Sequence, residues 1–356
     1  MKICIIGDGL ASLTLANVLV QKDIFVDIYS AKKNTLYNQS RTLGISKSNI
    51  DYLNNEITNI DNVSWKIQNI KIFTEKDSKK ELLKFDNKNN EIFSIVRNYK
   101  LQKLLLKNLK KNKLIKFKKN FDINKEKYKL VINSDPTHSY IKKFFSNKIE
   151  KDYNSYAYTT SIIHKKIKNN TAYQNFTKNG PIAFLPISNS ETSIVYSFKS
   201  MKKKNNFQMD DLVKKYNPIY SIKKIDQWSS FKLKSSCLRN YYKDNILAFG
   251  DLLHKIHPLA GQGFNMSLRD IKLLSELIDK KINLGLDLDS SLCREFQKKS
   301  QSKNFIFLSG IDWIYELFNL QSKININLFN KSINFIGNNK FVNTFLKNFA
   351  DSGIRY

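Results

Sequence analysis

Met1-Lys-Ile-Cys-Ile-Ile-Gly7-Asp-Gly-Leu-Ala-Ser12 is the stretch of sequence that decides the fold. Lys2–Ile6 has the character of a short buried strand, and Leu10–Val20 has the apolar spacing of a helix. Phe25–Tyr29 reads as a second strand. Strand, glycine turn, helix and strand together form a βαβ unit with a parallel sheet. The sequence therefore predicts an α/β fold with a Rossmann-like domain.

The turn between the first strand and the helix is suited to binding a pyrophosphate. A helix that starts there points backbone N–H groups at an anion, and only glycine lets the backbone come so close. A tight turn without a ligand would have a similar sequence, so the motif alone leaves both interpretations open. The third glycine of the usual pattern is replaced by serine, and the candidate binding residues are Gly7, Gly9, Leu10, Ala11 and Ser12.

The carboxylate that usually follows the second strand is missing. Phe25–Tyr29 is followed by Ser30, where an acidic residue would accept hydrogen bonds from ribose hydroxyls. Ser30 is a candidate for the same contact without the assistance of a charge. Asp27 lies two residues earlier than Tyr29, on the same face of the strand.

The middle of the chain changes character. Alternating or β-rich runs at Tyr156–His164, Ile182–Pro186 and Thr192–Phe198 predict an antiparallel sheet inserted into the first domain. Further on, Asn245–Phe249 reads as another parallel strand, and Asn265–Lys280 as an amphipathic helix. Lysine and asparagine clusters at 76–90 and 107–127 are expected to be turns and solvated faces, and Lys202–Asn206 a polar loop; Tyr99–Leu109 is expected to be a helix and Leu130–Asn133 a short strand.

We expect three parts. A discontinuous nucleotide-binding domain comprises 1–60, 95–150 and 238–295, and an inserted β-sheet substrate domain comprises 61–94 and 151–237. A helical C-terminal region, 296–356, is expected to pack on the nucleotide-binding domain or to dock on a membrane or partner, because its apolar stripe is rich in aromatic residues.

Composition narrows the class of protein. The 356 residues are 41% hydrophobic, which suffices for one large or two ordinary domains. No secretory signal is evident, and no run reaches the roughly 18–20 apolar residues of a spanning helix. Cys4, Cys237 and Cys293 are too widely spaced for a disulfide framework or a zinc site. A cytoplasmic protein is expected, with attachment to the inner face of the cytoplasmic membrane as an open alternative.

The net charge of +29 has two interpretations. Lysines spread along the whole chain, and no nucleic-acid-binding module is recognisable, so we expect no nucleic-acid partner. Attraction to an anionic membrane surface remains open. Arginine, the residue that forms bidentate contacts with phosphates, is rare and occurs only as Arg41, Arg97, Arg239, Arg269, Arg294 and Arg355.

A second motif is Gly250-Asp-Leu-Leu-His-Lys-Ile-His-Pro-Leu-Ala-Gly-Gln-Gly-Phe-Asn265. A strand delivers Gly250-Asp251, and a loop with two glycines then enters a helix. A carboxylate suits ribityl hydroxyls, and glycine backbone with a helix N-terminus suits an electron-rich ring. His254 and His257 do not form a metal pair, because no third ligand is near and Pro258 breaks a helical arrangement. We expect no metal site.

This second motif resembles the signature G-D-A-A-H-x-x-H-P-x-A-G-Q-G-x-N of the FAD-dependent aromatic hydroxylases of the p-hydroxybenzoate hydroxylase superfamily. The resemblance is to their ubiquinone-biosynthesis branch, with Leu252-Leu253 in place of two alanines. Phe176–Pro186 is similar to the segment F-T-x-x-G-P-x-A-x-L-P of that branch, and Arg41–Ser46 to its arginine segment. Ser134-Asp135-Pro136 stands where the family has A-D-G, and proline fixes φ there.

The resemblance implies an FAD site. It places Gly7, Gly9 and Ser12 at the pyrophosphate, and Arg41 and Asp251 at the ribityl-phosphate region. No catalytic residue is implied beyond the flavin environment, which is Pro258, Gly261, Gln262, Gly263 and Asn265. Residues and resemblance together give as candidates for cofactor binding Gly7, Gly9, Leu10, Ala11, Ser12, Ser30, Arg41, Arg97, Asp135, Gly250, Asp251, Pro258, Gly261, Gly263, Phe264 and Asn265.

The resemblance also implies an activity. It is that of an FAD-dependent monooxygenase that hydroxylates the ring of a polyprenylated phenol in ubiquinone biosynthesis, with O2 and NAD(P)H, through a flavin C4a-hydroperoxide. NAD(P)H is expected as a transient co-substrate, because no second dinucleotide motif is present. Two alternatives stay open. One is a flavoprotein of the same fold acting on another substrate, such as another aromatic hydroxylase or a prenyl reductase. The other is an assembly protein with weakened FAD binding.

Overall fold

The parallel sheet gathers four loops at one edge. The computed structural model describes residues 1–30, 40–75, 81–86, 91–119, 128–138, 143–199, 206–256 and 263–320. Its six-stranded sheet has the order β16-β17-β9-β1-β2-β8, parallel apart from β16. These strands are Lys2–Ile6 (β1), Phe25–Tyr29 (β2), Ile115–Lys118 (β8), Val131–Asn133 (β9), Tyr242–Lys243 (β16) and Ile246–Ala248 (β17).

The register of this sheet explains why distant motifs meet. Ile6 pairs with Tyr29 on one side and with Asn133 on the other, and Asn133 pairs with Ala248. The carboxyl ends of these four strands therefore coincide. In parallel sheets this edge is where ligands bind.

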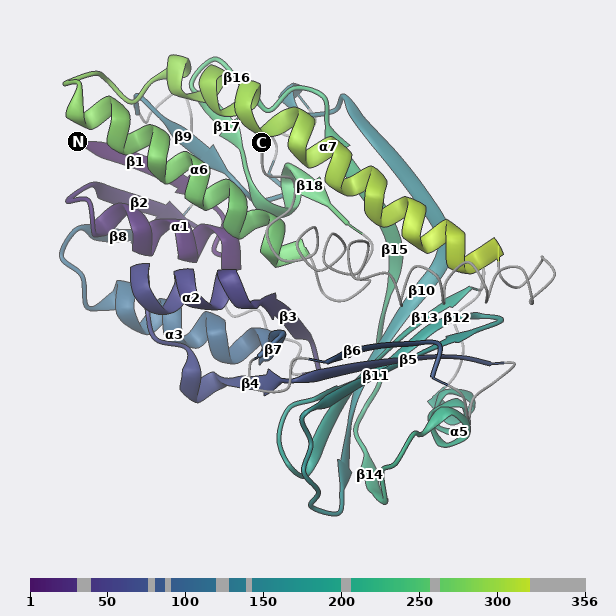
Figure 1. The fold of residues 1–356 in the computed structure, drawn as a ribbon. Coiled ribbons are helices and arrows are strands. Elements are labelled where there is room, and N and C mark those ends of the chain that lie inside the picture. The colour runs from purple at the N-terminus through teal and green to yellow at the C-terminus, as the bar shows by residue number, and fades with distance from the viewer. Residues whose placement is uncertain are drawn as a thin grey trace.

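Helices α1 and α7 pack against the parallel sheet, and other helices pack against α1 (Figure 1). The apolar residues of α1 are buried on nearly every side, because the helix contacts α3 and α6 as well as the sheet. The last described helix, α7, contacts α6, β16 and β17. The helices are Leu10–Val20 (α1), Lys47–Glu56 (α2), Asn98–Lys110 (α3), Gly263–Asn283 (α6) and Ser290–Leu320 (α7).

A nine-stranded sheet extends to the lower right in Figure 1. Its order is β18-β15-β10-β13-β12-β11-β5-β6, with β14 paired to β10, and β11 pairs with β5 in parallel. Helix α5 (Asn206–Tyr216) packs Met209 and Val213 against it. The strands are Asn69–Thr74 (β5), Leu83–Asp86 (β6), Lys148–His164 (β10), Thr171–Thr177 (β11), Gly180–Pro186 (β12), Glu191–Lys199 (β13), Ile222–Ile225 (β14), Ser229–Leu238 (β15) and His254–Lys255 (β18).

A small antiparallel sheet of order β3-β7-β4 lies beside α2 and α3. It consists of Thr42–Ser46 (β3), Ser64–Ile67 (β4) and Phe93–Arg97 (β7). This sheet takes β4 from one expected domain and β3 from the other, so the domain boundaries given above stay a prediction. Two short 3-10 helices complete the described elements, Asp61–Val63 (η1) and Gly250–Leu252 (η2).

The predicted fold class is confirmed: a Rossmann-like α/β part, a large mainly antiparallel sheet and a C-terminal helix. The expectation of turns and solvated faces at 76–90 and 107–127 was wrong in part. Residues 83–86 form β6, 115–118 form β8, and α3 continues to Lys110. Each of these two short strands carries only two apolar residues. Of the expected polar loop Lys202–Asn206, residues 202–205 lie outside the described residues, and α5 begins at Asn206.

No helix in the described part of the chain is both long and apolar enough to cross a membrane.

Candidate functional site

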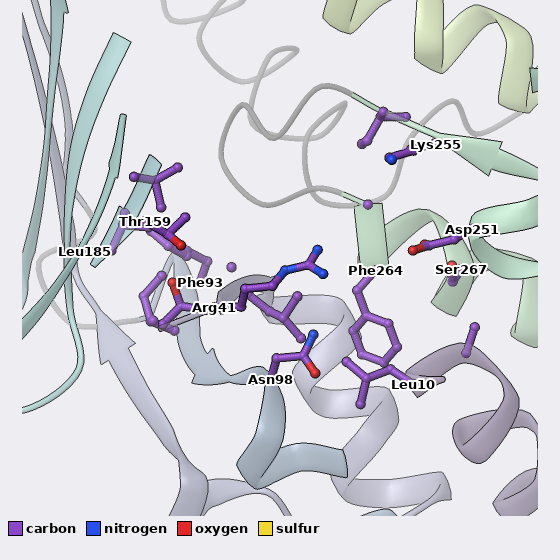
Figure 2. Close-up of a pocket in the computed structure, with 18 of the residues that line it drawn as sticks. Leu10, Arg41, Phe93, Asn98, Thr159, Leu185, Asp251, Lys255, Phe264 and Ser267 are labelled. Atoms are coloured by element: carbon purple, nitrogen blue, oxygen red, sulfur yellow. The ribbon is translucent and has the colours of Figure 1, made fainter. Parts of the chain in front are cut away.

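A cavity of about 810 Å³ lies between the carboxyl edge of the parallel sheet and the large sheet. Figure 2 shows Leu10, Asp251 and Phe264 on one side of it and Phe93, Thr159 and Leu185 on the other. The cavity thus joins the two expected domains. Ten of the candidate residues line it: Gly7, Gly9, Leu10, Ala11, Ser30, Arg41, Asp135, Asp251, Gly263 and Phe264.

The two glycines of the first loop have different roles. Gly7 has a φ of +106°, and a Cβ there would lie 2.7 Å from Oγ of Ser134, so the fold itself requires glycine. Gly9 has an ordinary φ of −69°, and a Cβ would meet nothing within 4 Å. The fold does not require glycine at position 9. Its missing side chain leaves open space on the cavity wall, as a cradle for a bound group would.

The start of α1 faces the same space. Gly9 is its N-cap residue; no side chain hydrogen-bonds to the cap, and no acidic residue occupies the first turn. The amide groups of Leu10 and Ala11 therefore have no capping partner among the described residues, and the positive end of the helix lies at the cavity. Such an end binds phosphate groups readily. The residues present fit a pyrophosphate.

Ser12 is buried rather than exposed to the cavity. Its hydroxyl group hydrogen-bonds to that of Ser134, which also donates to the carbonyl oxygen of Ile6 at 3.2 Å. The serine at the third-glycine position therefore ties the first turn of α1 to the loop after β9. This replacement keeps the close approach that glycine usually provides.

Proline at position 136 is accommodated by a turn. Oδ1 of Asp135 accepts hydrogen bonds from the backbone N–H of Thr137 at 2.8 Å and from its hydroxyl group at 2.7 Å. Pro136 occupies the second position of the turn Asp135–His138, where a fixed φ is favoured. Burial lowers the pKa of His138, although the charge of Asp135 opposes this, so a neutral imidazole is favoured.

The structure describes both ends of the second motif. Asp251, in η2, is exposed to the cavity, and Gly263 and Phe264 line it at the start of α6. Gly250 lies behind this wall, where a Cβ would come within 2.9 Å of the Cβ of Ala11. The expected ring contacts Pro258, Gly261 and Gln262 lie outside the described residues.

Besides Ser12 and Gly250, two further candidates do not line the cavity. Asn265 is fully buried: its amide donates to the carbonyl oxygen of Gly44 at 2.7 Å and accepts from the N–H of Ser46 at 3.1 Å. It ties α6 to β3, so its side chain acts behind the wall. Arg97 forms an ion pair with Glu191 and links β7 to β13. The cofactor-binding roles of both stay predictions.

Arg41 extends from the start of β3 into the cavity, as Figure 2 shows. Its guanidinium carbon lies 5.4 Å from the centre of the Phe231 ring, and its carbonyl oxygen accepts from the N–H of Asn98 at 3.1 Å. Among the described residues no acidic side chain forms an ion pair with Arg41, and the aromatic face stabilises its charge. Arg41 can therefore still form hydrogen bonds with an anionic ligand.

His254 ties the described part of the second motif to two helices. Its Nε2 lies 2.5 Å from Oδ2 of Asp270, and Oδ1 of that carboxylate accepts from the amide of Asn304 at 3.1 Å. Both members of the pair are buried. The contacts join β18, α6 and α7 beside the cavity. No group of three or more histidine, cysteine or acidic side chains in the described segments could hold a metal ion.

Sequence reasoning missed the apolar wall of the cavity. Its residues come from several strands of two sheets, each contributing one or two side chains, so no single segment shows the pattern. It also missed two polar residues near the first loop, Asp8 and Gln102. The apolar wall comprises Ile70, Phe85, Ile92, Phe93, Ile95, Tyr173, Leu185, Val195, Phe231 and Leu233.

Comparisons with known proteins agree with this geometry. Residues 129–283 match the family model described as FAD binding domain. The 3-demethoxyubiquinol 3-hydroxylase of Escherichia coli is 27% identical over 201 residues, 53% of this chain and 51% of that protein. The mitochondrial ubiquinone biosynthesis monooxygenase COQ6 of Dictyostelium discoideum is 26% identical over 208 residues, 47% of this chain and 42% of that protein. The chain spans about half the length of the curated relatives it matches.

Solved structures share the fold over nearly the whole chain. A p-nitrophenol 4-monooxygenase of Pseudomonas putida has a TM-score of 0.78 at 12% identity, over 99% of this chain and 98% of that one. HpxO of Klebsiella pneumoniae, in complex with FAD and uric acid, has a TM-score of 0.75 at 12% identity, over 97% and 95%. The resemblance identified from the sequence motifs is thereby confirmed at the level of the fold.

Proposed function

We propose that this chain hydroxylates the aromatic ring of a polyprenylated phenol. The premise is that it has the fold of the FAD-dependent aromatic monooxygenases and resembles the hydroxylases of ubiquinone biosynthesis. FAD is its cofactor, and NAD(P)H and O2 are its co-substrates. The observation that carries the proposal is a single cavity with two different ends. At one end lie the open space at Gly9 and the uncapped start of α1, and at the other lies the apolar wall.

The polar end suits the cofactor. Gly9 and the first amides of α1 bind the pyrophosphate, and the Arg41 guanidinium offers a further positive charge. Asp251 accepts hydrogen bonds from ribityl hydroxyls. When bound, FAD supplies the oxygen activation, which protein side chains do not provide. The serine at position 12 and the proline at position 136 are both accommodated, which supports retained FAD binding over its loss.

The apolar end suits the substrate. Leu185 and Val195, from β12 and β13, line this part of the cavity together with Phe93 and Phe231. Such a wall binds an aromatic ring with an apolar tail, and it keeps water from the reacting atoms. Two lysines of β15, Lys232 and Lys234, also line the cavity, and each forms an ion pair with an acidic residue of β10.

The polyprenyl substrate is lipid-soluble, so we further propose that the chain docks on an anionic membrane surface through α7. That helix exposes Phe305, Ile306 and Trp313, the last by 72%, and the chain carries a net charge of +29. We expect co-sedimentation with phosphatidylglycerol vesicles, reduced in Trp313→Ala and by high salt. Equal binding to neutral vesicles at high salt would contradict the electrostatic part.

The function is tested with the full chain and with a strain that lacks it. We expect a yellow protein with the flavin absorption bands, and accumulation of a polyprenylated phenol that lacks one ring hydroxyl. A yellow protein whose loss leaves the quinone precursors unchanged would indicate a flavoprotein acting on another substrate. A colourless protein that takes up no added FAD would indicate the assembly role.

Asp251→Ala is expected to weaken FAD binding by about 10- to 100-fold, because the substitution removes a carboxylate that lines the cavity and accepts hydrogen bonds from the cofactor. Flavin fluorescence titration of the apoprotein measures this. Asp279→Ala is the control, since Asp279 pairs with Lys22 away from the cavity. Unchanged affinity in Asp251→Ala would assign this residue a structural role.

A further inference from the structure

A carboxylate lies beside Ser30 although none follows β2 in the sequence. The hydroxyl group of Ser30 donates a hydrogen bond to Oδ2 of Asp8 at 2.8 Å. Asp8 follows β1 and Ser30 follows β2, and these neighbouring parallel strands end in register, with Ile6 opposite Tyr29. The glycine loop therefore delivers its acidic side chain to the end of the adjacent strand.

Backbone hydrogen bonds hold the loop at Asp8, and Asp8 lines the cavity. The amide of Gln102, on α3, donates to the carbonyl oxygen of Asp8 at 3.0 Å. The N–H of Gly7 donates to the carbonyl oxygen of Tyr29 at 2.8 Å, which ties the loop to β2. Asp8, Ser30 and Gln102 all line the cavity. Within the described segments, no lysine or arginine pairs with Asp8, so no structural ion pair explains this carboxylate.

The acidic residue within β2 serves another purpose. Asp27 is only 1% exposed and forms ion pairs with Lys2 at 2.8 Å and Lys118 at 2.9 Å. Burial raises the pKa of Asp27, but hydrogen bonds from Lys118, Lys2 and Tyr128 outweigh it and hold the pKa below its usual value. Asp27 does not line the cavity. It stabilises the sheet, which leaves Asp8 as the acidic residue next to the strand end.

We propose that Asp8 and Ser30 together bind the ribose of the adenosine half of FAD, in place of the single acidic residue that usually follows the second strand. This inference rests on the proposed function. The 2′- and 3′-hydroxyl groups of a ribose are two neighbouring donors. Oδ1 of Asp8 and the lone pairs of Ser30 Oγ are two neighbouring acceptors, one of them charged. The same carboxylate repels a 2′-phosphate, so the pair selects an adenosine whose 2′-hydroxyl is free.

The test measures whether Asp8 and the ribose hydroxyl act together. Apoprotein is titrated with FAD and with the FAD analogue that contains 2′-deoxyadenosine, for the wild type, Asp8→Asn and the control Asp279→Asn. We expect Asp8→Asn to bind FAD about tenfold or more weakly. We expect the analogue to bind more weakly than FAD to the wild type and to the control, but as well as FAD to Asp8→Asn, because the lost contact is the same one.

Exchanging the two residues distinguishes this role from a general effect on the loop. Ser30→Asp alone places two carboxylates together and is expected to weaken FAD binding. The double variant Asp8→Ser with Ser30→Asp has one carboxylate again, now at the end of β2, and is expected to recover most of the affinity. An FAD affinity of Asp8→Asn within about threefold of the wild type, with the analogue still discriminated, would overturn the inference and leave the proposed function standing. No FAD binding by the wild type would overturn both.

Discussion

Gly9→Val is expected to abolish FAD binding while the chain stays folded. The backbone at Gly9 has φ −69°, which valine adopts, and the space around its Cβ position is empty of protein atoms to 4 Å. A side chain there would occupy the cavity at the start of α1, where the pyrophosphate is proposed to lie. We expect FAD affinity to fall by about 1,000-fold or more, roughly 4 kcal/mol. Flavin fluorescence titration and thermal unfolding of the apoprotein measure the two quantities separately.

Gly7→Ala is the matched control for this experiment. It adds a smaller group in the same loop, but at φ +106° and with Oγ of Ser134 only 2.7 Å from the new Cβ. We expect a fall in the free energy of unfolding of the apoprotein, on the order of 1–3 kcal/mol. Full FAD occupancy in Gly9→Val would disprove the placement of the pyrophosphate.

Leu185→Trp is expected to abolish hydroxylation without weakening FAD binding. Leu185, on β12, lines the apolar end of the cavity, on the side opposite Asp251 and Phe264 (Figure 2). A tryptophan side chain would fill the space where the aromatic ring of the substrate is proposed to bind. Since small displacements of a substrate already reduce rates greatly, we expect kcat/KM to fall by about 100-fold or more. FAD affinity is expected to stay within about twofold of the wild type.

Leu185→Ala is the control for the change of shape. It removes side-chain volume from the same wall, so it leaves the reacting position open and is expected to raise KM more than it lowers kcat. If Leu185→Trp lost FAD and activity together, the cavity would not divide into a cofactor end and a substrate end. If it turned over substrate at the rate of the wild type, the substrate would bind elsewhere.

The local pattern of the chain predicts the parallel part of the fold well. Phe25–Tyr29 is a strand with the predicted bounds, and the predicted helices Tyr99–Leu109 and Asn265–Lys280 each extend by a few residues in the structure. The strand is buried almost throughout, and each helix buries one face, so the apolar residues recur at the expected spacing. Capping details set the last turns, which apolar spacing does not reveal.

Strands with few apolar residues were harder to predict. β8, Ile115–Lys118, alternates apolar residues with lysine, and Phe117 is 45% exposed, so the segment looks like a solvated loop. β10 begins at Lys148, eight residues before the predicted start at Tyr156, because its first half is polar and pairs with β15. These segments form strands because they pair with a neighbouring strand, and that partner is distant in the sequence.

The candidate site was predicted where a motif is continuous and missed where strands bring separate residues together. The two glycine-containing motifs contributed most of the lining residues that sequence reasoning named. Asn265 belongs to such a motif, yet its side chain faces β3, because only the side chains on one face of a helix can line the cavity. The carboxylate beside Ser30 comes from another strand end, which no spacing rule within β2 could reveal.

The pairing of β1 has a consequence for how the chain folds. Cys4 on β1 pairs with Val131 on β9, and Val131 pairs with Ile246 on β17; in the large sheet, β5 pairs with β11. The strands that are synthesised first therefore complete their sheets only with strands that are synthesised much later. Contacts of such long range slow folding. During synthesis the first strands have unpaired edges, which are prone to aggregation. A fragment that stops before Ile246 lacks β17 and the second motif, so an isolated N-terminal half is expected to need chaperones or to aggregate.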